Sequence, residues 1–241
     1  MLNPTTEQQL GEIVLGNSDD VDFAVAAANR AFETYSRTSK EHRLELLENL
    51  LEVTEKHLEE LAQAMTLEMG APITMSREAQ ADAAVGHLVA YIEAFKAQHQ
   101  RNVLANADTL LYEPIGVCGL ITPWNWPINQ IALKVIPALA TGCTCILKPS
   151  EHTPISATVY AQIIHEAGYP AGVFNLVQGD GPSVGSALSC HPDVQMMSFT
   201  GSTRAGKAIT RDAADTVKRV TLELGGKSPN LVFADCDLEA R

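Results

Sequence analysis

The 241-residue sequence lacks three patterns that would each indicate a class of protein. No run of lysine or arginine occurs, and the formal net charge is −12, so nucleic acids and anionic membranes are poor partners. No apolar run reaches the length of a membrane span, and Met1–Asp20 lack the basic-then-apolar layout of a signal peptide. We therefore expect a cytoplasmic protein with neither a nucleic-acid nor a membrane partner.

Cysteine is scarce, and its number is odd. The five cysteines form no CxxC pair, and the seven histidines form no HExxH or other metal-ligand spacing. An odd number of thiols, mostly inside apolar segments, favours a reducing compartment over a disulfide framework. We predict no metal site. The cysteines are Cys118, Cys143, Cys145, Cys190 and Cys236.

The most informative stretch present runs from Gly116 to Glu151. It predicts an apolar strand, a proline-fixed loop, a helix and a second apolar strand. Both strands are apolar along their whole length, which is typical of parallel strands buried on both faces. Polar groups follow their carboxyl ends, where open α/β sheets bind ligands. These groups are Asn125 after the first strand, and Lys148 and Glu151 after the second.

After residue 116 strands and helices alternate with short turns, which predicts a parallel, doubly wound α/β sheet with helices on both faces. Three amphipathic helices precede it, and their apolar stripes are those of core helices. The expected strands are Gly116–Thr122, Cys143–Leu147, Val173–Val177, Gln195–Phe199, Arg219–Glu223 and Ser228–Phe233. The expected helices begin near Val21 (capped by Ser18, Asp19 or Asp20) and near Ser39, and then span residues 77–98, 128–140, 154–166, 182–189 and 203–214.

Two hairpins are expected outside this alternation. One lies in Pro4–Val14 with Gly11 near its turn, and the other joins Arg101–Leu104 to Thr109–Glu113 through a polar turn. The second hairpin either crosses between domains or has a free strand edge that can pair with another strand. At the other end, Asp235–Asp237 cap a helix that has only four residues left, so we interpret the chain as a fragment.

Of three glycine-containing segments, two could bind phosphate. GDGPSVG (179–185) is one residue longer than the dinucleotide fingerprint, so a plain strand-to-helix turn remains the alternative. In FTGST (199–203), Gly201 and Ser202 could receive a phosphate at a helix N-terminus, or Ser202 could simply cap the helix. Gly226–Ser228 resemble the end of a P-loop, but Thr221 stands where glycine is required, which excludes that motif.

Two residues are candidates for catalysis. Asn125 lies between Trp124 and Trp126 in a loop fixed by two prolines, as an oxyanion donor requires, although a turn asparagine is the alternative. Glu223 ends a strand expected to be buried and precedes two glycines. This position suits a general base whose pKa is tuned by burial, and an ion pair with Lys227 is the alternative.

Five segments in this order and spacing, ITPWNWP, KPSE, GDGPSVG, FTGST and LELGGKSPN, resemble the aldehyde dehydrogenase superfamily over essentially the whole chain. The resemblance implies that Asn125 is the oxyanion donor and Glu223 the base that activates the thiol or the deacylating water. It also implies NAD, with NADP possible, as the coenzyme. The residues implied to bind it are Thr122, Trp124, Lys148, Ser150, Glu151, Gly181, Pro182, Gly185, Phe199, Thr200, Gly201 and Ser202.

The resemblance also implies a domain organisation. Residues 1–100 and 116–225 would form the Rossmann-like coenzyme-binding domain, 101–115 an oligomerisation hairpin, and 226–241 the start of a catalytic domain. The family's nucleophilic cysteine would lie beyond residue 241, and none of the five cysteines occupies its motif, so we expect the 241 residues alone to be inactive. The full-length protein would be a homodimer or homotetramer.

The implied reaction is oxidation of an aldehyde to a carboxylic acid through a cysteine thiohemiacetal and thioester. A non-catalytic dinucleotide-binding or structural relative is the alternative, but it would require neither Asn125 nor Glu223. A CoA-acylating relative is another, and Glu223 favours the hydrolytic branch. The sequence does not indicate which aldehyde is oxidised.

Overall fold

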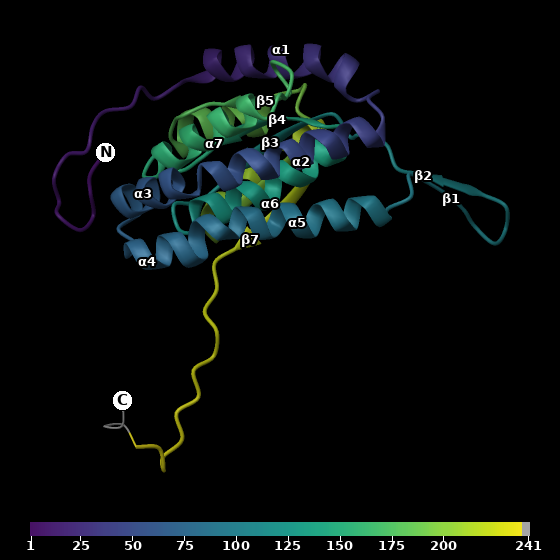
Figure 1. The fold of residues 1–241 in the computed structure, drawn as a ribbon. Helices are drawn as coiled ribbons and strands as arrows, with labels where there is room; N and C mark the ends of the chain where they lie inside the picture. Colours follow the sequence, from purple (N-terminus) through teal and green to yellow (C-terminus); the bar gives the residue numbers. More distant parts are fainter. Residues whose placement is uncertain (238–241) are drawn as a thin grey trace.

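The computed structural model, which describes residues 1–237, is built around a parallel five-stranded sheet in the order β5-β4-β3-β6-β7 (Figure 1). Its central strands β3 and β4 are buried at every position, which explains their continuous apolar sequence and confirms the predicted α/β class. The strands are β3 (Val117–Ile121), β4 (Thr144–Lys148), β5 (Phe174–Leu176), β6 (Met196–Gly201) and β7 (Arg219–Leu224).

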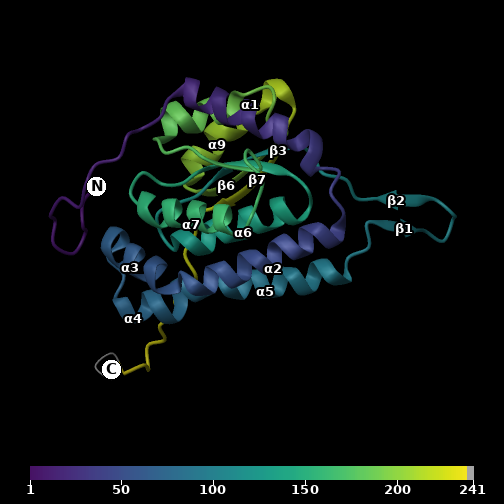
Figure 2. The same cartoon turned by 45° about the horizontal axis from the view of Figure 1, so that its top comes forward.

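Helices cover both faces of this sheet, and each face has its own apolar core. Alternate residues of the strands point to opposite sides, so Cys118 and Leu120 join one core while Val117 and Ile121 join the other. In Figure 2, α1 and α9 lie above the sheet and α6 and α7 below it, with α2 and α5 forming a further layer. The helices of the alternating region are α6 (Pro127–Ala140), α7 (Pro154–Glu166), α8 (Ser186–Cys190) and α9 (Thr203–Asp212). A π-helical turn (Gly181–Gly185) precedes α8, and a 3-10 turn (Ala214–Thr216) follows α9.

The amino-terminal segment differs from its prediction at two points. Helix α1 (Ser18–Tyr35) is capped by Asn17, not by the three residues after it, because Asn17 and Asp20 form a reciprocal capping box. The hairpin predicted in Pro4–Val14 is wrong. The chain turns at Pro4–Thr6 and forms one isolated bridge between Leu2 and Gln9, which is too little pairing for a stable hairpin.

The two long helices predicted after Ser39 are each divided. Ser39 caps α2 (Lys40–Lys56) as expected, but the chain turns at His57 before α3 (Leu58–Met69) begins. The third helix, predicted over residues 77–98, is divided into a π-helical turn (Ser76–Ala81) and α5 (Asp82–Ala97), and a short α4 (Ile73–Met75) that was not predicted precedes them. The apolar stripe continues across each break, which is why periodicity alone did not reveal the divisions.

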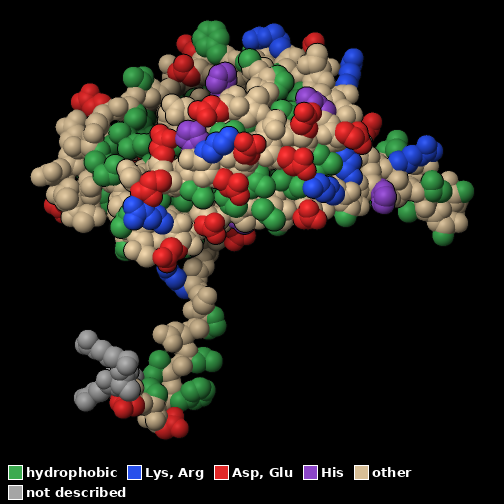
Figure 3. Space-filling view, in the orientation of Figure 1, with side chains coloured by type: hydrophobic (Ala, Val, Ile, Leu, Met, Phe, Trp, Pro, Cys, Tyr) green, Lys and Arg blue, Asp and Glu red, His purple; other side chains and the backbone are tan. Residues whose placement is uncertain are grey.

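The second predicted hairpin is confirmed. It pairs β1 (Arg101–Val103) with β2 (Thr109–Leu111) antiparallel and projects from the body in both cartoon views (Figures 1 and 2). Figure 3 shows hydrophobic side chains on the hairpin and on the extended tail. Val103, Leu111 and Phe233 are among the exposed large hydrophobic residues.

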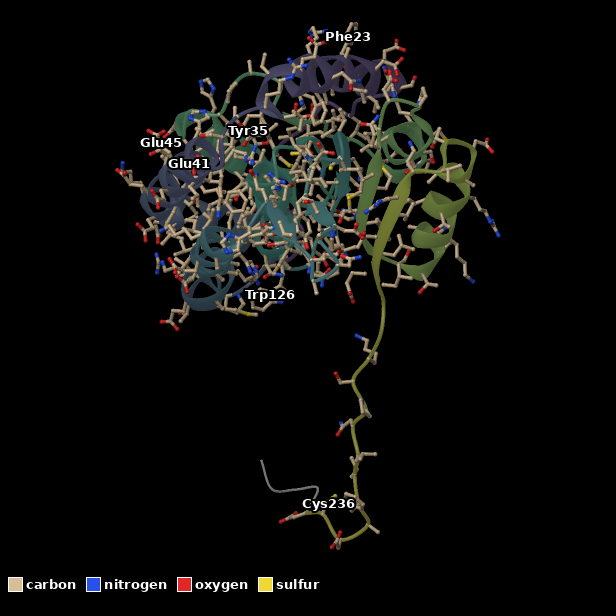
Figure 4. All side chains as sticks on the ribbon, turned by 90° about the vertical axis from the view of Figure 1, so that its right-hand side faces the viewer. Phe23, Tyr35, Glu41, Glu45, Trp126 and Cys236 are labelled. Atoms are coloured by element: carbon tan, nitrogen blue, oxygen red, sulfur yellow. The ribbon has the colours of Figure 1, made fainter. Side chains whose placement is uncertain are left out.

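The strand predicted at Ser228–Phe233 is not formed. Residues 225–233 run extended away from the body and pair with no strand within residues 1–237, so they make no ladder hydrogen bonds (Figure 4). The helix expected after Asp237 falls outside the described residues. None of the helices in the described range combines the length and apolar character needed to cross a membrane.

Candidate functional site

The carboxyl edge of the sheet brings together side chains that lie far apart in the sequence. The parallel register aligns Ile121 with Lys148 on one side and with Phe199 on the other, and it aligns Thr200 with Glu223. The backbone N–H of Thr122 donates to the carbonyl of Lys148 at 3.2 Å, which extends the alignment one residue past the strands. After β3 the next strands, β4 and β5, are added on one side, and β6 and β7 are added on the other. The carboxyl ends of β3 and β6 therefore mark the topological switch point where such sheets bind ligands.

The loop after β3 is held in a strained conformation. Trp126 has a φ of 56°, in the left-handed region that a large side chain rarely adopts, and Pro127 begins α6 directly after it. Trp124 is 53% exposed, and Asn125 is also exposed. The amide of Asn125 has no hydrogen-bond partner within residues 1–237, so it is free to donate to a ligand.

The end of β4 carries a buried cation beside a partly exposed carboxylate. Lys148 is 3% exposed, and its Nζ lies 3.4 Å from Oε2 of Glu151. Burial lowers the pKa of Lys148, while the negative charges of Glu151 and Asp180 oppose that shift. Ser150 is buried, and its Oγ accepts a hydrogen bond from the His152 N–H at 3.2 Å. This arrangement places one donor and one acceptor group side by side at the edge.

The segment after β5 contains a glycine, Gly181, with open space beside its Cα. A Cβ added to Gly181 would meet no atom within 4 Å, so packing within the chain does not explain this glycine. Pro182 is exposed as well, whereas Gly185 is buried. Asp180, which sequence reasoning did not select, caps this turn by accepting the Ser183 N–H at 2.8 Å.

The end of β6 leads directly into α9. Oγ of Ser202 accepts the Ala205 N–H at 3.2 Å, so the capping role considered for this serine is present. Phe199 is only 5% exposed, and its ring lies under Gly201, where a Cβ would come within 2.5 Å of the ring. Phe199 therefore supports the loop from below, while Ser202 is exposed.

Glu223 differs from its prediction. It is exposed on β7, which has only β6 as a neighbour, and no ion pair joins it to Lys227 in the described part of the chain. Its electrostatic neighbour is the half-buried Lys134, whose pKa is lowered by burial and raised by the charge of Glu223. Nζ of Lys134 donates to Ser198 Oγ at 3.2 Å. Sequence reasoning did not select Lys134, although it is the single charged residue in the otherwise uncharged α6, and this feature could have identified it.

None of the five cysteines lies at this edge. All three of the buried cysteines lie toward the amino-terminal ends of the central strands: Cys118 in β3, Cys143 directly before β4, and Cys145 in β4. Cys190 ends α8, and Cys236 lies in the extended tail (Figure 4). Across residues 1–237, no three His, Cys, Asp or Glu side chains are grouped so that they could hold a metal ion.

A cavity of about 1140 Å³ opens beside the edge. Trp124, Glu151 and Thr153 line it together with Glu68 of α3 and the amino-terminal segment. Thr122 and Thr153 each bury a hydroxyl that has no hydrogen-bond partner among the described residues. The edge thus offers a cavity, a cation, a carboxylate, unpaired hydroxyls and a helix N-terminus in one place.

Comparison with known proteins places this arrangement in a family. The model of the aldehyde dehydrogenase family matches residues 1–241. A 3-succinoylsemialdehyde-pyridine dehydrogenase from a Pseudomonas species is 54% identical over 240 residues, which cover 99% of this chain and 50% of that protein. The chain spans about half the length of such relatives.

Solved structures agree. An aldehyde dehydrogenase from Bartonella henselae superposes with a TM-score of 0.94 at 50% identity, covering 98% of this chain and 50% of that one. A cysteine-to-alanine mutant of aldehyde dehydrogenase C from Pseudomonas syringae, in complex with NAD+ and octanal, gives 0.93 at 50% identity over 98% of this chain and 48% of that one. The sequence motifs, the fold and these matches agree, and the chain belongs to the aldehyde dehydrogenase family.

Proposed function

We propose that this chain forms the coenzyme-binding part of an NAD-dependent aldehyde dehydrogenase that oxidises an aldehyde to a carboxylic acid. One observation carries the proposal: the carboxyl edge of the sheet joins Lys148 and Glu151 to an open glycine and to the N-terminus of α9. The relatives with similar sequence and structure are named aldehyde dehydrogenases, and one of them was solved with NAD+ and octanal.

The residues present fit a dinucleotide. Lys148 and Glu151 would bind the ribose hydroxyls as donor and acceptor, and Ser202 with the free N–H groups of α9 would receive the pyrophosphate. Gly181 leaves room for the adenine side because a Cβ there would meet nothing in the chain. The Glu151 carboxylate would repel a 2′-phosphate, which favours NAD over NADP.

Bound NAD supplies the hydride acceptor. The chain's own residues would prepare the aldehyde carbonyl and the water. Asn125, held by the strained loop and without another partner within residues 1–237, would donate to the developing oxyanion. Glu223, exposed beside Lys134, would take a proton from the thiol or from the deacylating water. No cysteine lies at the edge, so we place the nucleophile outside residues 1–241.

The remaining parts of the proposal concern organisation. Residues 101–115 would be an oligomerisation hairpin that joins subunits into a homodimer or homotetramer, since β1 and β2 project with exposed apolar side chains. Residues 1–100 and 116–225 would form the coenzyme domain, and 226–241 would begin the catalytic domain. We place the protein in the cytoplasm because five unpaired thiols fit a reducing compartment.

A titration of the purified protein with NAD and NADP tests the proposal. Both tryptophans, Trp124 and Trp126, flank Asn125 at the edge, so their fluorescence reports binding there. We expect saturable quenching by NAD at lower concentration than by NADP. A Lys148→Met variant should weaken NAD binding by about tenfold, the loss of one hydrogen-bonded charge. The matched control is Lys56→Met, which changes an exposed lysine on α2. Absence of saturable NAD binding would contradict the proposal.

A further inference from the structure

A buried carboxylate of α3, which is not one of the proposed coenzyme-binding groups, caps the amino-terminal end of α7. Glu68 lies in the last turn of α3 and is 4% exposed. Its Oε2 accepts the Ile155 N–H at 2.6 Å, and its Oε1 accepts the Ser156 N–H at 3.1 Å. The Ser156 hydroxyl also donates to Oε1. A negative group at this position also complements the positive end of the α7 helix dipole.

Helix α7 has no cap of its own. Thr153 occupies its N-cap position without a side-chain hydrogen bond, and the Thr153 hydroxyl has no partner within residues 1–237. Pro154 has no N–H, so the first two donors of the helix are those of Ile155 and Ser156. Both reach the same carboxylate, 87 and 88 residues earlier in the chain. Glu68 therefore replaces the local cap.

The capped end is tied to the turn that carries Glu151. The Thr153 N–H donates to the Ser150 carbonyl at 3.1 Å, which closes a tight turn around Glu151 and His152. β4 fixes the beginning of this turn at Lys148, and α7 fixes its end at Pro154. A shift of the first turn of α7 would move Glu151 relative to Lys148, since few residues separate them.

We propose that Glu68 is a positioning residue for coenzyme binding: by holding the start of α7 it sets the distance between Glu151 and Lys148. The inference rests on the proposed function, because it gives a role to a residue behind the same edge. Glu68 lines the cavity beside Glu151 without reaching the coenzyme groups through any hydrogen bond of its own.

The charge state of Glu68 makes the pH dependence of NAD binding a test of the positioning role. If Glu68 only stabilised the fold, replacing it would leave this pH dependence unchanged. Burial raises the pKa of this carboxyl to about 7, although its three hydrogen bonds favour the ionised form. Below this pKa the carboxyl loses its charge, and its protonated oxygen becomes a donor and a weaker acceptor of the helix N–H groups, so coenzyme affinity should fall between about pH 8 and pH 6. Other titratable groups that line the cavity are Glu7, Glu12, Glu151, His152 and the N-terminal amine of Met1.

The experiment compares the wild-type protein with Glu68→Gln, which keeps the shape and removes the charge. We expect the Kd for NAD at about pH 8 to rise about tenfold. The pH dependence of Kd should also become flatter than in the wild type, and this difference separates Glu68 from the other cavity groups. Glu55→Gln removes an exposed carboxylate from α2 and should change nothing. Hydrogen exchange of residues 149–160 should accelerate only in Glu68→Gln.

Two further variants strengthen the test. Adding Thr153→Asp to Glu68→Gln supplies a local cap and should recover part of the affinity and of the amide protection. Ser156→Ala removes one of the three donors and provides a milder change if Glu68→Gln fails to fold. We expect it to weaken NAD binding by about twofold.

The possible failures are distinguishable. If the wild-type protein binds no NAD, the proposed function is wrong and the inference falls with it. If the wild type binds NAD but Glu68→Gln binds it equally well with the same pH dependence, only the positioning role is overturned. Unchanged exchange in residues 149–160 would show that Glu68 does not hold the helix.

Discussion

At the scale of single residues, the carboxyl edge shows how position determines what a polar group can do. Lys148 and Glu151 are only three residues apart, yet one is buried and the other partly exposed. Asn125, in the loop after β3, and Glu223, near the carboxyl end of β7, are both exposed at the same edge of the sheet. Exposure keeps these two groups available to a reacting molecule and reduces their contribution to the stability of the fold.

The residue-scale prediction concerns Asn125 and rests on the proposed oxidation of an aldehyde. Asn125→Ala should lower kcat by about 10²–10³-fold, because one oxyanion donor is lost, while the Kd for NAD stays unchanged. Single-turnover and steady-state assays with a simple aldehyde measure the first quantity, and tryptophan quenching measures the second. Asn129→Ala, in the first turn of α6, is the control because it removes an amide that instead bonds His87 at 2.7 Å. Wild-type turnover in Asn125→Ala would exclude the oxyanion role.

At the scale of elements, side chains that cross between helices fix how the layers pack. His57, at the break between α2 and α3, lies between two carboxylates. Its Nδ1 is 2.8 Å from Oε2 of Glu60, and its Nε2 is 3.0 Å from Oε2 of Glu166 at the end of α7. Together with Glu68 this histidine attaches α3 to both ends of α7. The hydrogen bonds to Glu60 and Glu166 raise the pKa of His57.

The element-scale prediction follows from that pKa. A histidine whose pKa is raised by folding stabilises the folded state fully below its unfolded pKa of about 6.5, and this stabilisation is lost as the pH rises through the folded value. We expect the contribution of His57, up to about 1 kcal/mol for a partly exposed pair, to be complete below about pH 6.5 and to be lost as the pH rises through the raised pKa of the folded state. Urea unfolding of the wild type and of His57→Gln at a series of pH values upward from about 6 measures it. His42→Gln, an exposed histidine on α2, is the control. An identical pH slope in wild type and His57→Gln would refute the assignment.

At the scale of the whole molecule, the body is covered on both faces, but two segments leave it. The hairpin of β1 and β2 and the tail of residues 225–237 both carry exposed apolar side chains (Figure 3). Leu231 is 77% exposed and Phe233 71% exposed. Unpaired backbone beside apolar side chains favours association with another chain.

The whole-molecule prediction is that the isolated 241-residue chain associates as its concentration rises. Leu231→Ser combined with Phe233→Ser should reduce this association, and sedimentation velocity or light scattering measures the change. Val217→Ser, which alters a single exposed apolar residue on the body, is the control. If the double variant associates as strongly as the wild type, the tail does not drive the process, and the hairpin becomes the region to change next.

The local sequence pattern was sufficient to predict those elements whose residues leave few alternative structures. The strands around Val117 and Thr144 and the helix after Pro127 were predicted to within about a residue, because continuous burial and proline leave few alternatives. The helix break at His57 was missed because an apolar stripe can continue across a break. The cap at Asn17 was missed because the sequence does not distinguish which of several adjacent polar residues caps the helix.

The sequence by itself determined the α/β class, the alternation after Gly116 and the motifs of the carboxyl edge, since these depend on spacing along the chain. Only the tertiary structure decided how much each group is buried. Glu223 is exposed because β7 has a neighbour on one side alone, and Ser228–Phe233 form no strand because no partner lies beside them. Glu68 caps α7 from 87 residues away, a pairing that no local pattern encodes, because burial and hydrogen bonding depend on what the fold brings alongside.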